Sequence, residues 1–73
     1  MDIAEPQQIY IKWDSYQKKY LIAFRVRCPY ADCRRVNRFG CGFHAEPKVY
    51  CVKGVRTCDH CGEEFAVNFE EDE

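Results

Sequence analysis

The sequence lacks any apolar stretch approaching the roughly 20 residues that a membrane-spanning helix needs. It also lacks the apolar core of a secretory signal peptide, because its first ten residues contain two acidic residues and Pro6. Glycine and proline are scarce, at four and three residues, and nothing repeats along the chain except paired cysteines. We therefore expect an intracellular protein, cytoplasmic or nuclear, with no membrane partner.

The chain is also short, at 73 residues. A chain of this size buries only about 60% of its unfolded surface, and it has no room for an enclosed substrate cleft. We therefore expect neither an enzyme nor a small-molecule substrate. Because 47% of the residues are hydrophobic and 15% are aromatic, residues 1–73 should still fold as one domain. The six cysteines are the expected source of additional stability.

The net charge of −1 conceals an uneven distribution. Residues 1–24 are balanced, with three basic and three acidic residues. Residues 25–56 contain eight basic and two acidic residues, whereas residues 57–73 contain seven acidic residues and no basic one. We therefore expect a basic central region, an acidic tail at residues 70–73, and a surface of two signs.

Alternating apolar and polar residues predict a small all-β fold that begins with a β-hairpin. Strands are expected at residues 8–13 and 20–27, joined by a polar turn, so that the hairpin spans residues 7–27. The second strand has two sides, with Leu21, Ala23 and Arg25 on one and Ile22, Phe24 and Val26 on the other. No segment shows the 3.6-residue period of a helix.

Three further strands are expected, at residues 34–39, 49–56 and 65–69. The first of them should end at the Gly40-Cys41-Gly42 break, and residues 43–47 should form a loop. Gly54, within the second, indicates a bulge or a close approach of the backbone. Residues 1–6 should be frayed, because a proline and a polar pair precede the first apolar run.

Four of the six cysteines form two closely spaced pairs, Cys28 with Cys33 and Cys58 with Cys61. Two thiolates on a tight turn can hold one face of a tetrahedral Zn²⁺ ion, and Gly62 suits the left-handed conformation that closes such a turn. The 24 residues between the pairs suffice for a strand, a loop and a returning strand, which would bring the pairs together. We predict one structural zinc ion held by these four cysteines, the alternative being a disulfide framework.

With these motifs, residues 26–69 resemble the zinc-ribbon family. In that family two cysteine knuckles lie over a small three-stranded antiparallel sheet, which here implies a ribbon over residues 28–69. The first knuckle departs from the usual pattern in its wider spacing and in having Arg34 where glycine is expected. The resemblance implies a role in gene expression, because zinc ribbons occur in transcription factors, RNA polymerase subunits, ribosomal proteins and replication proteins. Small stand-alone ribbons include phage and viral regulators, and a viral chain would reside in its host cell.

The remaining cysteines and histidines have less specific patterns. Cys41 and His44 have a C-x2-H spacing that could complete a competing site with the first cysteine pair, but they lack a second matching pair, so a loop role is favoured. Cys51, in the middle of an expected strand, is better explained as a small apolar core residue. His60 lies inside the second knuckle and should face solvent or a partner. No cysteine sits in a recognisable nucleophile motif.

Two kinds of binding module fit the chain. The first is a non-enzymatic zinc-binding adaptor that docks on a gene-expression machine such as RNA polymerase. Its expected anchors are the hairpin aromatic residues Tyr10, Trp13, Tyr16 and Tyr20, which are otherwise core residues.

The alternative is direct nucleic-acid binding by the basic region from Arg25 to Arg56. The expected partner-binding residues are Arg34, Arg35, Arg38, Lys48, Lys53 and Arg56. The aromatic residues expected to stack on bases, or else to form the core, are Tyr30, Phe39, Phe43 and Tyr50. The near-neutral total charge slightly favours protein docking over independent binding to nucleic acid.

Overall fold

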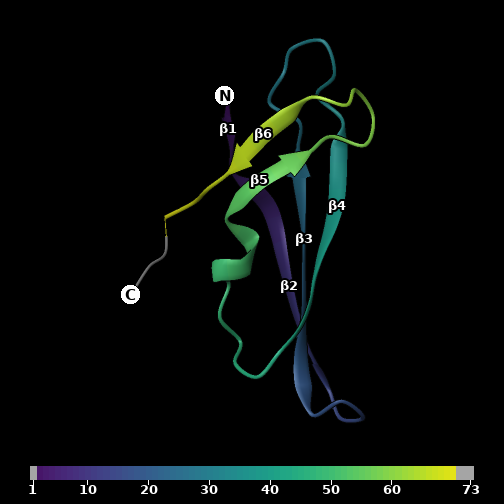
Figure 1. Cartoon of the computed structure of the whole chain (residues 1–73), viewed down its shortest axis with the longest axis vertical. Helices are drawn as coiled ribbons and strands as arrows, with labels where there is room; N and C mark the ends of the chain where they lie inside the picture. The colour runs from purple at the N-terminus through teal and green to yellow at the C-terminus, as the bar shows by residue number, and fades with distance from the viewer. Residues whose placement is uncertain (1, 71–73) are drawn as a thin grey trace.

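Three nine-residue strands form the larger sheet of the computed structural model, which describes residues 2–70 (Figure 1). They are β2 (Pro6–Asp14), β3 (Lys19–Arg27) and β4 (Val36–His44). The central strand β3 pairs antiparallel with both neighbours. Ile22, Phe24 and Val26 are fully buried on one side of β3, as their alternation predicts. The predicted N-terminal hairpin is therefore confirmed.

A smaller sheet packs over one end of the larger one. Its strands are β1 (Ile3–Ala4), β6 (Glu64–Val67) and β5 (Gly54–Thr57), in that spatial order. β6 pairs parallel with β1 and antiparallel with β5. The strands expected to form one ribbon sheet are thus divided between two sheets, because β4 pairs with β3 and not with β5 or β6. The all-β class is confirmed.

The N-terminal segment is ordered, so the expectation that residues 1–6 are frayed is wrong for the described residues from Asp2 onward. The Asp2 carbonyl accepts a hydrogen bond from the Ala66 amide at 2.9 Å, and the Ala4 carbonyl accepts one from Asn68 at 3.1 Å. The Ala4 side chain is 7% exposed and belongs to the core. A short parallel strand thus satisfies backbone groups at the edge of β6.

The glycines of β4 do not end the strand, contrary to expectation, and residues 43–44 are strand and not loop. The register with β3 shifts between Ile22 and Ala23, which face Gly42 and Gly40, so that Cys41 is an extra residue. Gly42 has φ +79°, a conformation that favours glycine. The Gly40-Cys41-Gly42 segment is therefore a β-bulge within a longer strand.

The expected strand at residues 49–56 is replaced by a 3₁₀ turn, η1 (Tyr50–Val52), followed by the shorter β5. This turn connects the loop after β4 to the smaller sheet, and it buries Val52. Gly54 has φ +140°, and a Cβ atom there would lie 3.2 Å from the Arg56 guanidinium. A close approach to the Gly54 backbone is therefore present, as expected, and the group that approaches it is the Arg56 side chain.

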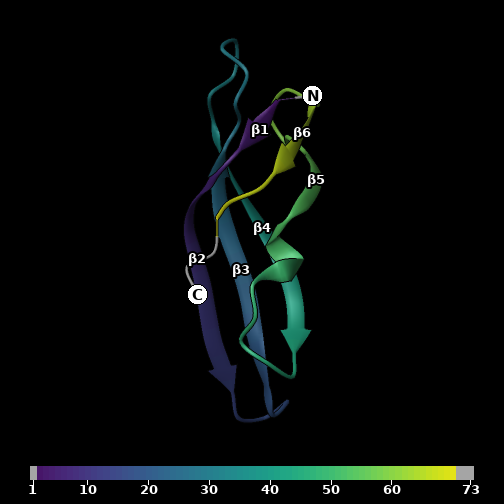
Figure 2. The ribbon, with the colours of Figure 1, turned by 90° about the vertical axis from the view of Figure 1, so that its left-hand side faces the viewer.

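The core lies between the two sheets, at the end of the molecule that contains the cysteine pairs (Figure 2). Phe39 links the layers, because its ring lies 5.5 Å from that of Phe24 and 6.5 Å from that of Phe65. The opposite end of the larger sheet, with the turn between β2 and β3, extends beyond the smaller sheet. Among residues 2–70, no helix has the length and apolarity needed to cross a membrane.

We predict that Ala4→Asp destabilises the fold by at least about 2 kcal/mol, because a carboxylate at this position would be buried without a partner. The matched control is Ile3→Asp on the same strand, where the side chain is 64% exposed and the change should be small. Chemical denaturation of both variants measures the difference. Equal stability of the two variants would contradict a structural role for β1.

Candidate metal centre

Four sulfur atoms converge where the two sheets meet. Cys28 follows β3 and Cys33 precedes β4, whereas Cys58 follows β5 and Cys61 precedes β6. Their Sγ atoms all lie within 4.8 Å of one another, and none of the four is in a disulfide. The prediction that the intervening strands bring the two pairs together is confirmed. The cluster could hold a metal ion.

The sulfur–sulfur distances fit tetrahedral coordination. With a Zn–S bond of about 2.3 Å, the sulfur atoms of a tetrahedral site lie about 3.8 Å apart. The Sγ atoms of Cys28 and Cys61 are 3.8 Å apart, and those of Cys33 and Cys58 are 3.6 Å apart. A disulfide would require about 2 Å. The residues present therefore suit a metal ion that takes four thiolate ligands.

Backbone hydrogen bonds shape the first knuckle. The amides of Cys33 and Arg34 both donate to the Tyr30 carbonyl at 3.1 Å, and the Cys28 amide donates to Arg35 at 2.9 Å. Arg34 has φ +57°, a left-handed conformation that glycine adopts more readily than other residues. The knuckle therefore closes with a residue other than glycine in this conformation, at a cost of about 1–2 kcal/mol.

The second knuckle closes in the same way. The Cys58 amide donates to the Glu63 carbonyl, and the Gly62 amide donates to the Cys58 carbonyl, both at 2.9 Å. Gly62 has φ +78°, as its position after the cysteine pair predicts. His60, at the turn of this knuckle, is exposed, as expected.

The four thiols differ in acidity. Burial acts to raise the pKa of Cys58, but backbone amides of Cys61 and His60 and the Asn37 amide lower it to about 6. The Glu63 amide acts to lower the pKa of Cys61, yet desolvation and the neighbouring sulfurs raise it to about 12. Burial also raises the pKa of Cys28. The Cys58 thiolate therefore forms readily, whereas Cys28 and Cys61 need a nearby cation to favour their thiolate forms.

Asn37 is a functional residue that the sequence analysis missed. Its side chain is 2% exposed, and its Nδ2 donates to the Cys58 Sγ at 3.4 Å and to the Arg35 carbonyl at 3.3 Å. Its Oδ1 accepts from the Asp59 amide at 3.0 Å. One side chain on β4 thus orients the second knuckle. The sequence signal that could have identified it is its place in the alternation, because Asn37 is a polar residue on the same, inward side of β4 as Phe39.

Tyr30 of the first knuckle also connects the two knuckle regions. Its hydroxyl, in the first knuckle, donates to the Glu64 carbonyl at the start of β6. Of the aromatic residues expected to stack on bases, Tyr30 has this structural contact and Phe39 packs against the core. Phe43 and Tyr50 are exposed.

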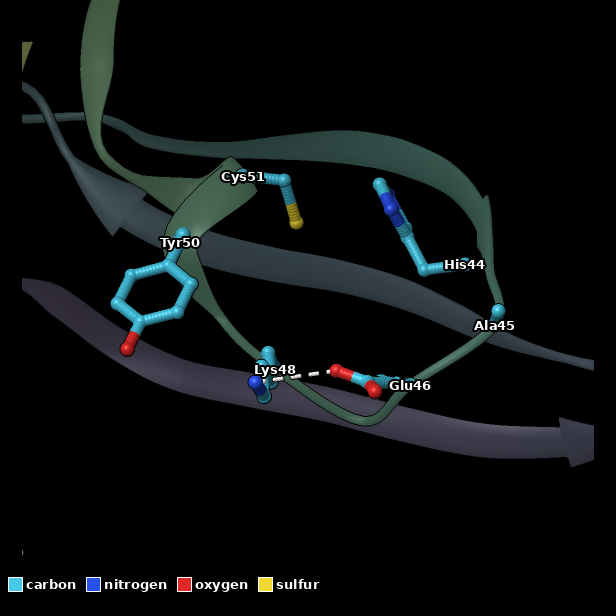
Figure 3. A pocket seen from close by; sticks show the side chains of 6 residues that line it. All are labelled: His44, Ala45, Glu46, Lys48, Tyr50 and Cys51. Carbon is cyan, nitrogen blue, oxygen red and sulfur yellow. Dashed lines mark ion pairs between the residues drawn. The ribbon is translucent and has the colours of Figure 1, made fainter.

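Cys41, His44 and Cys51 lie apart from the four-cysteine cluster. Among residues 2–70, only the four knuckle cysteines form a group of three or more potential ligands. The His44 Nε2 lies 2.8 Å from the Cys41 carbonyl, and the His44 and Cys51 side chains line an open hollow of about 500 Å³ (Figure 3). Cys51 packs against the core, as expected, although it lies in η1. Burial and the nearby Cys51 thiol raise the pKa of Cys41 to about 11.

The six basic residues expected to form one binding surface have different surroundings. Arg34, Arg35 and Arg38 are exposed at the first knuckle and on β4. Lys48 forms an ion pair with Glu46 at 3.1 Å. Lys53 lies over the Phe69 ring at 5.0 Å.

Arg56 has a structural role in the space between the layers. Its Nη2 donates to the Cys51 carbonyl at 2.8 Å, and its guanidinium lies 5.5 Å from the Phe24 ring. In the predicted acidic tail, Glu70 is exposed, and residues 71–73 lie outside the described residues.

Comparisons of the chain with protein-family models, with curated proteins and with solved structures found no match. The case for the metal centre therefore rests on its own geometry: four converging sulfurs at tetrahedral spacing, two hydrogen-bonded knuckles, and a buried amide directed at one ligand.

We predict one zinc ion per chain and loss of β-structure on chelation, because metal-binding energy is folding energy in domains of this kind. Cys58→Ser should abolish binding, whereas the matched control Cys51→Ser should retain it. Metal analysis by mass spectrometry and circular dichroism with and without EDTA measure both effects. Two zinc ions per chain, or loss of metal in Cys41→Ser, would contradict this ligand set.

We predict that Asn37→Leu weakens zinc binding about 10- to 100-fold, because it removes the hydrogen bond to the Cys58 sulfur and the anchor of the second knuckle. The control is Asn68→Leu, where the asparagine is exposed and lies just beyond the end of β6 opposite to Cys61. Competition with a zinc chelator of known affinity measures the change. Unaltered affinity in Asn37→Leu would show that the amide does not support the ligand.

Proposed function

We propose that the protein is a non-enzymatic zinc-binding adaptor that docks on a larger protein of the gene-expression machinery, such as RNA polymerase. Four cysteine ligands would fill every position of a tetrahedral zinc ion, so the metal would stabilise the fold and activate no water. The resemblance of the two knuckles to zinc ribbons supplies the gene-expression context. The docking surface is argued from the distribution of exposed apolar side chains.

Exposed apolar residues gather at the end of the larger sheet that extends beyond the smaller one. We call this surface the hairpin end, and it comprises Ile11 and Trp13, on the side of the sheet that Ile22 shares, and Tyr16 in the adjoining turn. Leu21 and Phe43 are also exposed, but on the opposite side of the sheet. The Trp13 side chain is 51% exposed and that of Tyr16 is 91% exposed, although both are large enough to anchor a core. Tryptophan and tyrosine are the residues most enriched at binding hot spots. This apolar end is the observation that carries the proposal.

The charges around the hairpin end indicate the chemistry of its partner. Lys12, Lys18 and Lys19 are exposed there. The nearby Asp14 carboxylate accepts hydrogen bonds from the amides of Tyr16 and Gln17 within the turn. The Trp13 ring is held edge-on against Tyr20, with the ring centroids 4.9 Å apart, so it is presented with little freedom. The complementary surface is an apolar pocket with an acidic rim.

The test compares Trp13→Ser/Tyr16→Ser with a matched control, Tyr50→Ser/Val55→Ser, which removes exposed apolar side chains from elsewhere. A partner is captured from the native source, identified, purified and titrated with each variant. We expect the hairpin-end variant to bind at least about 30-fold more weakly, as for loss of a hot spot, and the control to bind as wild type.

Two outcomes would contradict the proposal. One is equal affinity of both variants for the purified partner. The other is a stable dimer of the pure protein, measured by light scattering, that dissociates to monomers in the hairpin-end variant. A second copy of the chain would then cover this surface.

A further inference from the structure

A second surface is defined by two arginines that face each other across the larger sheet. Arg25 on β3 and Arg38 on β4 are direct partners in the register. Directly opposed side chains have Cβ atoms about 4.5–5.5 Å apart, and like charges in this arrangement destabilise a sheet. The alternation of β3 places Arg25 opposite to the buried Phe24 and Val26, so the pair faces outward, away from the smaller sheet.

A third arginine extends this cluster toward the metal centre. Arg27 is exposed on the same side of β3, two residues beyond Arg25 and diagonal to Arg38. We call Arg25, Arg27 and Arg38 the arginine face. Within residues 2–70, no hydrogen bond or ion pair engages any of these guanidinium groups. The only acidic residue in the three strands is Asp14, at the hairpin end.

Arg56 shows how the same fold treats an arginine that has a structural role. Its guanidinium donates to two carbonyls and lies over the Phe24 ring. Among the described residues the arginine face has no such partners, and its like-charge pair costs stability that an anion would recover. A site that is repulsive when empty is typical of a binding surface.

A hollow lies next to the arginine face. Ala23 and Gly40 are partners in the row beside Arg25 and Arg38, and their small size leaves a shallow hollow. The hollow has a volume of about 280 Å³ and is lined by Tyr10, Ala23 and Arg38. The Tyr10 ring is half-buried, and its hydroxyl donates to the Gln8 side chain at 2.8 Å, which fixes the ring at the edge of the hollow.

We infer that this outward face of the β2–β3–β4 sheet binds single-stranded nucleic acid. The arginine face would contact consecutive phosphates, and a base would lie in the hollow against Tyr10. Cationic side chains that follow a backbone, next to an aromatic ring that accepts a base, are the two elements of single-strand binding. A duplex would use the arginines alone, because its bases are stacked inside. This function goes beyond protein docking, since it uses a different surface from the exposed aromatic side chains of the hairpin end.

The experiment measures fluorescence anisotropy of a labelled 12-nucleotide single strand, as DNA and as RNA, and of the matching duplex, with the zinc-loaded protein. Arg25→Gln/Arg38→Gln should bind the single strand at least tenfold more weakly. Its slope of log affinity against log salt should fall by about 1.4, because two phosphate contacts are lost. The control Lys18→Gln/Lys48→Gln removes the same charge elsewhere and should change affinity less than threefold.

Tyrosine variants test the base contact. Tyr10→Leu should weaken single-strand binding about fivefold or more, and Tyr10→Phe should restore it, because both aromatic rings can stack. The duplex should bind more weakly than the single strand and should not respond to Tyr10→Leu. A duplex bound as tightly as the single strand would overturn the single-strand assignment.

Thermal melting separates loss of binding from loss of folding. Arg25→Gln/Arg38→Gln should melt at or above the wild-type temperature at low salt, because it removes a repulsive pair. The oligonucleotide should raise the melting temperature of wild type and not of this variant. Equal affinity of this variant and the lysine control would overturn the inference. Trp13→Ser/Tyr16→Ser should bind the oligonucleotide as wild type does, so failure of one proposal leaves the other intact.

Discussion

The four-sulfur cluster is the constraint on which the rest of the structure depends. Two of its cysteines flank the larger sheet and two flank the smaller sheet, so the cluster joins the layers at the end where the core lies. Asn37 and Tyr30 cross the same junction by hydrogen bonds. Because a chain of 73 residues has a small core, a metal ion bound there would hold together two sheets that bury few side chains between them.

The unequal sizes of the sheets decide which surfaces are available. The smaller sheet covers one face of the larger sheet, and only at the end with the cysteines (Figures 1 and 2). Within residues 2–70, no layer therefore covers the apolar side chains at the hairpin end, and none covers the outward face of β2–β3–β4. The two proposed contacts use these two surfaces, one apolar and one cationic, in a molecule about 41 Å long.

Local features were predictable where the cause is local. The alternation in β3 depends only on which residues are apolar, and each cysteine knuckle is a turn closed by its own backbone amides. The glycines of β4 show the limit, because Gly40-Cys41-Gly42 fits a strand end and a bulge equally well in sequence. Pairing with Ile22 and Ala23 of β3 makes it a bulge, and that pairing is a long-range choice.

By itself, the sequence determined the all-β class, the hairpin and the four-cysteine set, because strand alternation and knuckle spacing depend only on residues that are close together in the sequence. Only the tertiary structure decided the division into two sheets, the parallel pairing of β1 with β6, the contact of Asn37 with Cys58, and the separation of the basic residues into structural and exposed groups. Each of these depends on which distant strands become neighbours, and hydrogen bonding between strands does not depend on the spacing of residues along the chain.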